Sequence, residues 1–402
     1  MTRLAAVSDL QIDTCWCRKI SIMSVHDPAK AQETRKIRLV PRDSAGRSFD
    51  VIPHDERLRG EFGEYIADAG LINAANTALA LERPLLLTGE PGCGKSDFAW
   101  VAARALGGEE LGPLCCYIRS DTRARDLLYH YDALRRFGDA QYGQAALCRD
   151  GGVELTGATA RNQSARSAAA DPRSYIRLRP LGVALMTAGR REVVLIDEID
   201  KAPRDLPNDL LHVLDAGTFE IAELDGSLDG QPHADHCEHP LKRKMGRPEG
   251  CRKPLVVITS NAERQLPEPF LRRCIFYPIP PPSRLRLLEI ARARLGVSGD
   301  GNSLAERLTV DLKQLVYTFA ALRKSTEEQR LIKAPTTAEM IEWLRACVQI
   351  YRPEDIRSQL RKIVDSVDFE SGRIDHTSGC SWADLPGISC LIKHSEDLRA
   401  LR

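Results

Sequence analysis

The chain has 402 residues, more than one hydrophobic core usually organises, so we expect two folded domains with extensions or insertions. Hydrophobic residues make up 43% and charged residues 28%, with 28 glycines and 23 prolines, and this composition excludes a collagen-like or wholly disordered chain. The 57 basic and 56 acidic residues leave a net charge of +1, which predicts neither nucleic acid nor an anionic membrane as a partner.

Apolar runs and cysteine content point to the cytoplasm. No apolar run approaches the ~20 residues that a membrane-spanning helix needs, so no membrane insertion is expected. Asp9 and Asp13 interrupt the N-terminal segment where a secretory signal would need an apolar core. Twelve cysteines are too sparse for a disulfide-built scaffold. We therefore expect a cytoplasmic protein whose thiols are mostly reduced.

Residues 1–55 lack a sustained hydrophobic period and are predicted to be a poorly ordered extension, apart from a short edge strand at 36–40. Strands and helices then alternate over residues 56–281. The expected buried strands are Leu85–Leu87, Cys115–Ile118, Glu192–Ile196 and Leu255–Ile258. The expected helices are Ile66–Leu81, Lys95–Leu106, Asp126–Arg136, Leu181–Ala188 and Asp205–Leu214. This alternation predicts an α/β domain with a parallel sheet flanked by helices.

Two unpatterned stretches, 137–173 and 225–252, interrupt this domain and are predicted to be surface insertions. After the prolines at 280–282 the strands cease. Helical periods predict a small α-helical lid domain over 282–350, with helices at Ser283–Leu295, Leu304–Lys324 and Thr337–Val348. Thr336 and Glu339 form a capping box at the start of the last of these helices. Residues 351–402 carry one helical stretch, and their role stays open.

The segment after the first buried strand fits G-x-x-x-x-G-K-[ST], the pattern of a phosphate-binding loop. It consists of Gly89, Glu90, Pro91, Gly92, Cys93, Gly94, Lys95 and Ser96. Glycines let backbone N–H groups curl around phosphate oxygens, and the following helix presents its positive end to the anion. Lys95 can neutralise the β- and γ-phosphates, and the Ser96 hydroxyl can coordinate Mg²⁺.

Two further strands end in polar residues at the same sheet edge. The strand at 193–196 ends in Asp197 and Glu198, where Asp197 is placed to hold Mg²⁺ and Glu198 to polarise an attacking water. The strand at 255–258 is followed by Asn261, whose amide can bond that water or the γ-phosphate. A plain acidic turn and a plain turn asparagine are the alternatives, and the phosphate loop upstream argues against them.

Arg272 and Arg273 follow the segment 266–271 and leave two interpretations open. An arginine on a rigid surface element can reach the γ-phosphate bound by a neighbouring subunit. Alternatively, the two arginines belong to a solvated basic turn with a salt bridge to Glu268.

Together these motifs resemble an AAA+ ATPase of the MoxR branch, in particular its dynein-related, AAA_5-like bacterial members, over residues 56–351. Residues 89–96 match Walker A, 193–198 match Walker B, Asn261 matches sensor 1, and Arg273 matches the arginine-finger position, with Arg272 as a second candidate. The resemblance implies binding and hydrolysis of ATP with Mg²⁺. It also implies a ring, commonly a hexamer, that remodels proteins, often with partners that bear von Willebrand factor A domains.

One position departs from that pattern. Thr336 stands where the lid of related proteins offers a sensor 2 arginine. Threonine carries no charge, so either Lys333 substitutes for the arginine or the function is absent.

One polar insertion is rich in potential metal ligands, namely His233, His236, Cys237, His239 and Cys251. This density resembles a zinc site, but the paired spacings of such sites are missing, so a solvated loop is the alternative.

Two functions fit the motifs. The first is a motor, an oligomeric ATPase that remodels a protein partner and needs Glu198 and Arg273 for turnover. The second is a nucleotide-gated switch with slow hydrolysis, which the missing sensor 2 charge favours. A small-molecule kinase fits poorly, because Glu198, Asn261 and a separate helical lid suit hydrolysis between subunits better.

Overall fold

The computed structural model describes residues 51–401 except 55–56, 61–62, 109–110, 140, 142–170, 189, 227–228, 230–240, 249, 296–308, 329–331, 351–352, 370–371 and 375–378. The expected N-terminal extension with its edge strand therefore lies outside the described residues, except for 51–54. So does most of the first insertion. No helix within the described residues combines the length and apolar content needed to cross a membrane.

Five parallel strands form the central sheet of the described chain. They are β3 (Leu85–Thr88), β4 (Leu114–Tyr117), β7 (Val193–Asp197), β10 (Leu255–Ser260) and β11 (Ile275–Pro278). Their order is β11-β3-β10-β7-β4, so β10 lies between the strand that leads into the phosphate loop and the strand that ends in Asp197. The four strands expected from the sequence are confirmed, and β11 is an additional edge strand.

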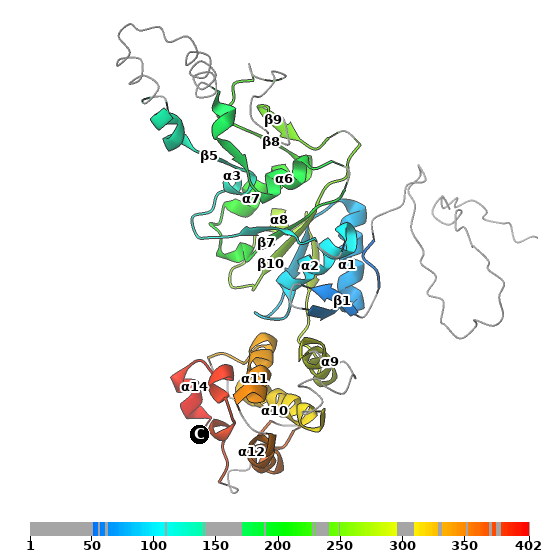
Figure 1. Cartoon of the computed structure of the whole chain (residues 1–402), viewed down its shortest axis with the longest axis vertical. Helices are drawn as coiled ribbons and strands as arrows, with labels where there is room; N and C mark the ends of the chain where they lie inside the picture. The colour runs from blue at the N-terminus through cyan, green and yellow to red at the C-terminus, as the bar shows by residue number, and fades with distance from the viewer. Residues whose placement is uncertain are drawn as a thin grey trace, which may run out of the picture. The chain divides into compact units, whose positions relative to one another are not determined.

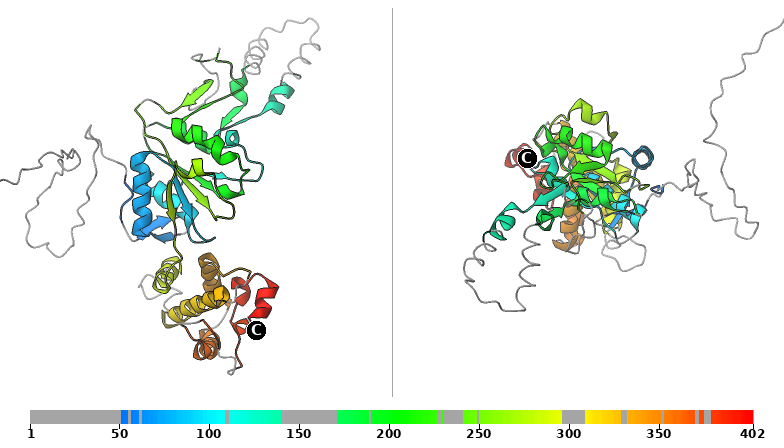
Figure 2. Two further views of the ribbon diagram at one scale, coloured as in Figure 1. Left: turned by 180° about the vertical axis from the view of Figure 1, so that it is seen from behind. Right: turned by 90° about the horizontal axis from the view of Figure 1, so that it is seen from above.

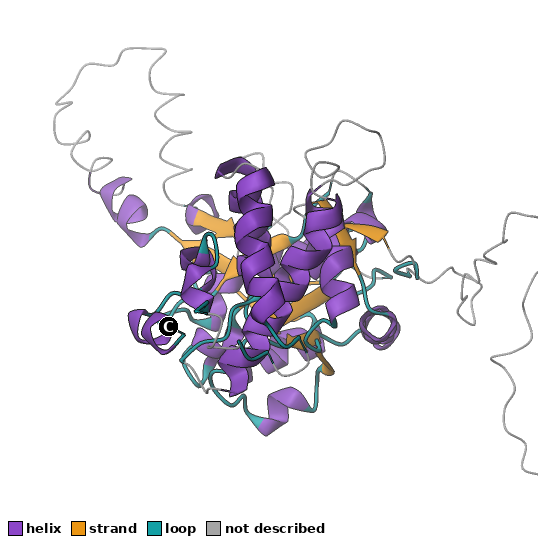
Figure 3. Ribbon diagram, turned by 90° about the horizontal axis from the view of Figure 1, so that it is seen from below, coloured by secondary structure: helices purple, strands orange, loops and turns teal. Residues whose placement is uncertain are grey.

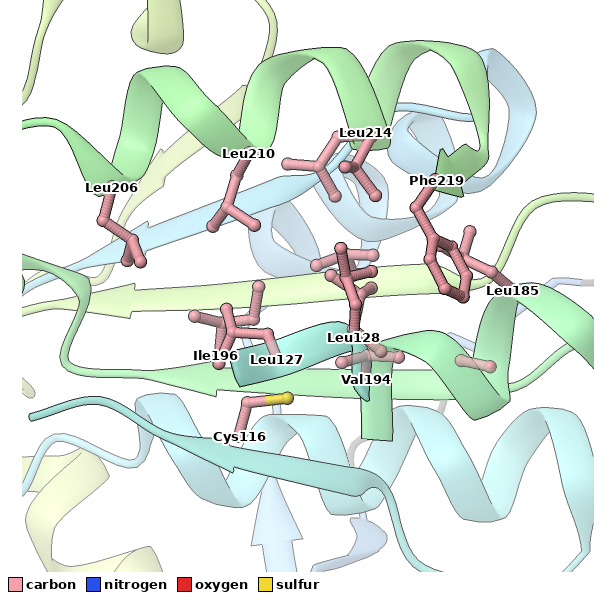
Figure 4. Packing of buried hydrophobic residues seen from close by; sticks show 14 of the residues in the cluster. Cys116, Leu127, Leu128, Leu185, Val194, Ile196, Leu206, Leu210, Leu214 and Phe219 are labelled. Carbon is pink, nitrogen blue, oxygen red and sulfur yellow. The ribbon is translucent and has the colours of Figure 1, made fainter. Parts of the chain in front are cut away.

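Helices cover both faces of this sheet (Figures 1 and 2). One face packs on α1 (Ala69–Leu81) and α2 (Lys95–Gly107), and the other on α3 (Ala124–Leu128), α6 (Pro180–Met186) and α7 (Leu206–Ala216). Alternate residues of β7 supply the two cores, because successive strand side chains point to opposite faces. Val193 and Leu195 join the α1–α2 core, whereas Val194 and Ile196 join the core under α7 (Figure 4). The α/β fold class is therefore confirmed.

Three small hairpins replace regions that the sequence analysis treated differently. Strands β1 (Arg57–Gly60) and β2 (Gly63–Ile66) pair antiparallel, so the first helix begins at Ala69, not Ile66. The expected helix at 126–136 is wrong as one element. Strand β5 (Tyr129–Tyr131) interrupts it and pairs with β6 (Ile176–Leu178), and residues 133–139 are helical again. Within the second expected insertion, β9 (Lys244–Gly246) pairs with β8 (Thr218–Glu220).

The C-terminal region is helical (Figure 3). It comprises α9 (Arg284–Leu295), α10 (Thr309–Glu328), α11 (Thr337–Ile350), α12 (Pro353–Ser366), α13 (Ile388–Leu391) and α14 (Ser395–Ala400). The three lid helices expected from the sequence are confirmed. Side chains beyond residue 350, including Leu360 and Leu401, share one hydrophobic cluster with Phe319 and Trp343 of those helices. The buried Trp343 ring also donates from Nε1 to the carbonyl of Pro386 at 2.6 Å. Residues 353–401 therefore complete the core of the lid.

Candidate nucleotide-binding site

The loop between β3 and α2 has the backbone of an anion cradle. Gly92 and Gly94 have φ angles of 72° and 92°, in the left-handed region that favours glycine. Gly94 also caps the N-terminus of α2. A Cβ added at Gly94 would lie 2.9 Å from the ring of the buried Tyr65, so a larger residue fits neither the angle nor the space. The loop therefore aims the positive end of α2 at its own concave side.

Lys95 is held inside this loop. Its side chain is buried, and Nζ donates to the carbonyl oxygens of Gly89 and Glu90, each at 2.8 Å. The ammonium thus lies where phosphate oxygens bound by the loop would meet it. Cys93 Sγ lies 3.9 Å from Nζ. Burial raises the pKa of the Cys93 thiol, although the Lys95 charge acts in the opposite direction, so Cys93 stays protonated at neutral pH.

A hydroxyl and a carboxylate meet where Mg²⁺ was expected. Ser96 Oγ donates to Asp197 Oδ1 at 2.7 Å, which joins the start of α2 to the end of β7. Both groups are oxygen donors of the kind that Mg²⁺ prefers. No cluster of three or more histidine, cysteine or acidic side chains that could hold a metal occurs among the described residues. This pair suits an ion that keeps waters and phosphate oxygens as its other ligands. The residues present therefore fit Mg²⁺.

Thr259 of β10 connects the two acids, and sequence reasoning missed it. Its Oγ1 donates to Asp197 Oδ1 at 2.6 Å and accepts the backbone N–H of Glu198 at 2.8 Å. Thr259 is 1% exposed. A polar residue in an otherwise apolar buried strand was the available signal, because buried hydroxyls are nearly always hydrogen-bonded.

Glu198 has a left-handed backbone conformation, and both of its carboxylate oxygens accept hydrogen bonds. Its φ of 58° is left-handed, which is rare for a residue with a long side chain. Oε1 accepts a long hydrogen bond from Asn261 Nδ2 at 3.4 Å, and Oε2 pairs with Lys201 Nζ at 2.6 Å. The hydrogen bond to Glu198 raises the pKa of Lys201. The structure therefore brings Glu198 and Asn261 together, as the motifs predicted.

A second residue missed from the sequence, Asp200, fixes the turn that carries Asn261. Asp200 is buried, and its Oδ2 accepts the backbone N–H groups of Asn261 and Glu263 at 3.1 and 3.0 Å. Between them Ala262 has a φ of 58°. A carboxylate oxygen that accepts from the backbone on both sides of Ala262 stabilises this strained turn and so orients the Asn261 amide.

The two arginines lie apart from this cluster. Arg273 Nε pairs with Asp215 at the end of α7 at 2.6 Å. Arg272 Nε lies 3.7 Å from Glu268, the salt bridge considered as the alternative, and its side chain is 81% exposed. Within the described chain neither arginine forms a hydrogen bond or ion pair with residues 89–96. In the described chain both arginines are exposed surface groups.

The lid meets the phosphate loop through residues other than Lys333. Lys333 pairs with Glu339 at 3.5 Å, and Thr336 caps α11 in the capping box predicted from the sequence. A Cβ added at Gly92 would lie 3.3 Å from Thr336 Oγ1, so Thr336 does lie beside the loop. Among the described residues, the charged lid side chain that pairs with the loop is Arg323, in the C-terminal half of α10, where no motif marked it.

Residues 84–274 match the family model of the AAA domain, dynein-related subfamily. The chain contains an AAA domain over these residues. The match spans the AAA+ domain from the residue before β3 to the residue before β11, and so includes the phosphate loop, both acids and Asn261. No curated protein matches the chain.

Of the residues considered for zinc, only Cys251 is described, and it is a free thiol. The other four lie outside the described residues, so the metal site and the solvated loop both stay open as alternatives.

Proposed function

We propose that this AAA+ protein is a MoxR-type ATPase that hydrolyses ATP with Mg²⁺. We further propose that it remodels protein partners as a ring of subunits, namely a hexamer. The observation that carries the ATPase assignment is the hydrogen-bonded chain from Ser96 through Asp197 and Thr259 to Glu198. It ties the phosphate loop to both acids across three neighbouring segments of the fold. A plain acidic turn does not need such a link.

Each residue of this cluster has a chemical role in the proposed reaction. Lys95 and the loop N–H groups bind and orient the phosphates. Ser96 and Asp197 would hold Mg²⁺, which neutralises phosphate charge when bound. Glu198 accepts a proton from the attacking water, and Asn261 orients that water or the γ-phosphate.

The oligomer is supported by what a single chain lacks. Among the described residues, the cation that forms an ion pair with Glu198 is Lys201, so its charge is already engaged by that carboxylate. We propose that Arg273, or Arg272 beside it, supplies the missing charge to a neighbouring subunit in the ring. The MoxR resemblance adds a protein with a von Willebrand factor A domain as the proposed partner class.

A nucleotide-gated switch is the second candidate function, and two contacts favour it. Glu198 is paired with Lys201, and Arg273 with Asp215, so both groups needed for turnover are engaged elsewhere in the same chain. If those pairs persist in the assembly, hydrolysis is slow and the bound nucleotide acts as the signal.

Glu198→Gln tests the assignment. We expect MgATP affinity, measured by calorimetry, to stay within a few-fold of wild type, while steady-state phosphate release falls on the order of a hundredfold or more. Glu192→Gln is the matched control, because Glu192 lies at the opposite end of β7 and pairs with Arg190. Unchanged turnover in Glu198→Gln would exclude Glu198 as the base. Tight binding with almost no turnover in the wild type would favour the switch.

The same variant tests the ring and the client. Glu198→Gln should hold the ATP-bound assembly, so its mass by light scattering should rise on addition of MgATP. A chain that stays monomeric at all concentrations contradicts the ring. Capture with this trap, compared with Lys95→Ala as the non-binding control, should identify the protein partner.

A further inference from the structure

One arginine of the lid is buried against the phosphate loop. The Arg323 side chain, on α10, is about one-tenth exposed, and its Nη2 donates to both carboxylate oxygens of Glu90 at 2.7 and 2.6 Å. Its Nε also bonds Glu327, one turn along the helix, at 3.1 Å. Glu90 is the second residue of the loop, 233 positions away in the sequence. A long-range contact of this quality places α10 against the loop.

The Glu90 carboxylate is unfavourable for the chemistry of this loop. Like charge weakens binding of phosphate anions, and Glu90 belongs to the segment that must cradle them. Burial is the main cause that raises the pKa of the Cys93 thiol, and the negative charge of Glu90 adds to this rise. The Glu90 charge is therefore felt inside the loop. Among the described residues, Arg323 is the cation paired with Glu90. The Glu90 carboxylate, whose side chain is 47% exposed, is therefore balanced by a side chain of the lid.

A second lid element packs on the same loop. A Cβ added at Gly92 would lie 2.8 Å from Ala338 Cβ, in the first turn of α11. Helices α10 and α11 therefore both meet residues 89–96, one through an ion pair and one through close packing. Displacement of the lid from the loop would break the ion pair and leave the Glu90 charge unbalanced.

We infer that Arg323 is a positioning residue that acts through Glu90, so that the loop binds nucleoside di- and triphosphates tightly only while α10 is seated on it. Arg323 neutralises the Glu90 carboxylate, whereas Lys95 and the backbone N–H groups of the loop bind the phosphates. By linkage, a bound nucleotide strengthens seating of the lid by the same factor. This inference rests on the proposed ATP site and adds a route from that site to the lid.

A double-mutant cycle in the full chain tests the inference. Arg323→Gln should weaken binding of both MgATP and MgADP on the order of tenfold, equal to ~1.4 kcal/mol. Glu90→Gln alone should bind at least as tightly as wild type. In the double variant the affinity should return to within about threefold of wild type, because the unbalanced charge is gone. Arg323→Lys, which keeps the charge, should lose less than Arg323→Gln.

Arg284→Gln is the matched control, because Arg284 is a lid arginine that donates to the carbonyl of Phe369 within the lid. It should leave nucleotide affinity unchanged. A loss in Arg323→Gln that persists in the Glu90→Gln background would overturn the inference, since Arg323 would then act on the nucleotide directly or on lid folding alone. Equal affinities of Arg323→Gln and wild type would overturn it as well. Failure of wild type and Arg284→Gln to bind any nucleotide would instead remove the proposed function itself.

Discussion

Replacement of Thr259 by valine tests whether the link between the two acids supports both stability and turnover. The substitution nearly preserves shape but deletes the hydroxyl, which donates to Asp197 and accepts from the N–H of Glu198. Asp197 keeps its bond from Ser96 at 2.7 Å, so the carboxylate is not left wholly without donors. The Glu198 N–H loses its acceptor beside a strand that is fully buried.

The magnitude follows from the two lost bonds. A hydrogen bond to a charged group contributes about 1.5–3 kcal/mol, and an orphaned buried donor costs about 1–3 kcal/mol. Burial of the new methyl group offsets about 0.8 kcal/mol. We therefore expect the free energy of unfolding to fall by about 2–5 kcal/mol. Turnover should fall on the order of tenfold or more, because Asp197 and the left-handed turn at Glu198 lose their common support.

Urea denaturation followed by circular dichroism measures the first effect, and phosphate release measures the second. Thr318→Val in α10 is the matched control. Thr318 is equally buried, but its hydroxyl has no hydrogen-bond partner in the described chain. The control should be neutral or slightly stabilising, with unchanged turnover. If Thr259→Val behaves like Thr318→Val, the proposed link contributes nothing and the reasoning from the hydrogen-bonded chain is refuted.

Two further predictions concern charge at the phosphates. Lys95→Ala should abolish ATP binding in calorimetry, because only backbone dipoles would then face the β- and γ-phosphates, and unchanged affinity would remove the phosphate-loop assignment. Arg273→Ala should bind ATP normally yet hydrolyse it ~10³–10⁵-fold more slowly. Mixing Arg273→Ala subunits with Glu198→Gln subunits should recover part of the activity, because some interfaces then pair an intact Glu198 with a neighbour's intact Arg273. Failed complementation, together with turnover per subunit that does not depend on protein concentration, would contradict a finger acting between subunits. Arg272→Ala should be measured in parallel.

The sheet was predictable where strands are buried on both faces. The apolar runs at 85–87 and 193–196 are continuous, and such runs are typical of central parallel strands. Strand β11 escaped notice because Ile275–Pro278 alternates between half-buried and exposed residues, as an edge strand does. The short hairpin strands of three or four residues escaped for a different reason. Their pairing depends on partners up to 49 residues away, which periodicity does not reveal.

The candidate site shows the same division. Residues 89–96, Asp197, Glu198 and Asn261 follow strand ends in recognisable patterns, and the structure brings them to one sheet edge. Thr259 is marked only as a polar residue in a buried strand, and Asp200 and Arg323 belong to no pattern. The roles of all three come from contacts 61 to 233 positions away in the sequence. Hydrogen-bond geometry, and not residue type, identifies such residues.

The participation of residues 353–401 in the lid core affects the order in which the chain folds during synthesis. The five strands of the sheet are complete once Pro278 has left the ribosome, so the AAA+ domain can close its two cores early. The lid cannot close until Leu401 emerges, because that side chain shares a cluster with Phe319 and Trp343. For the 73 residues of elongation between Glu328, the end of α10, and Leu401, α10 therefore exists without its full core. During that interval Arg323 has no complete helix bundle to hold it against Glu90, and the Glu90 carboxylate in the phosphate loop lacks its partner from the lid.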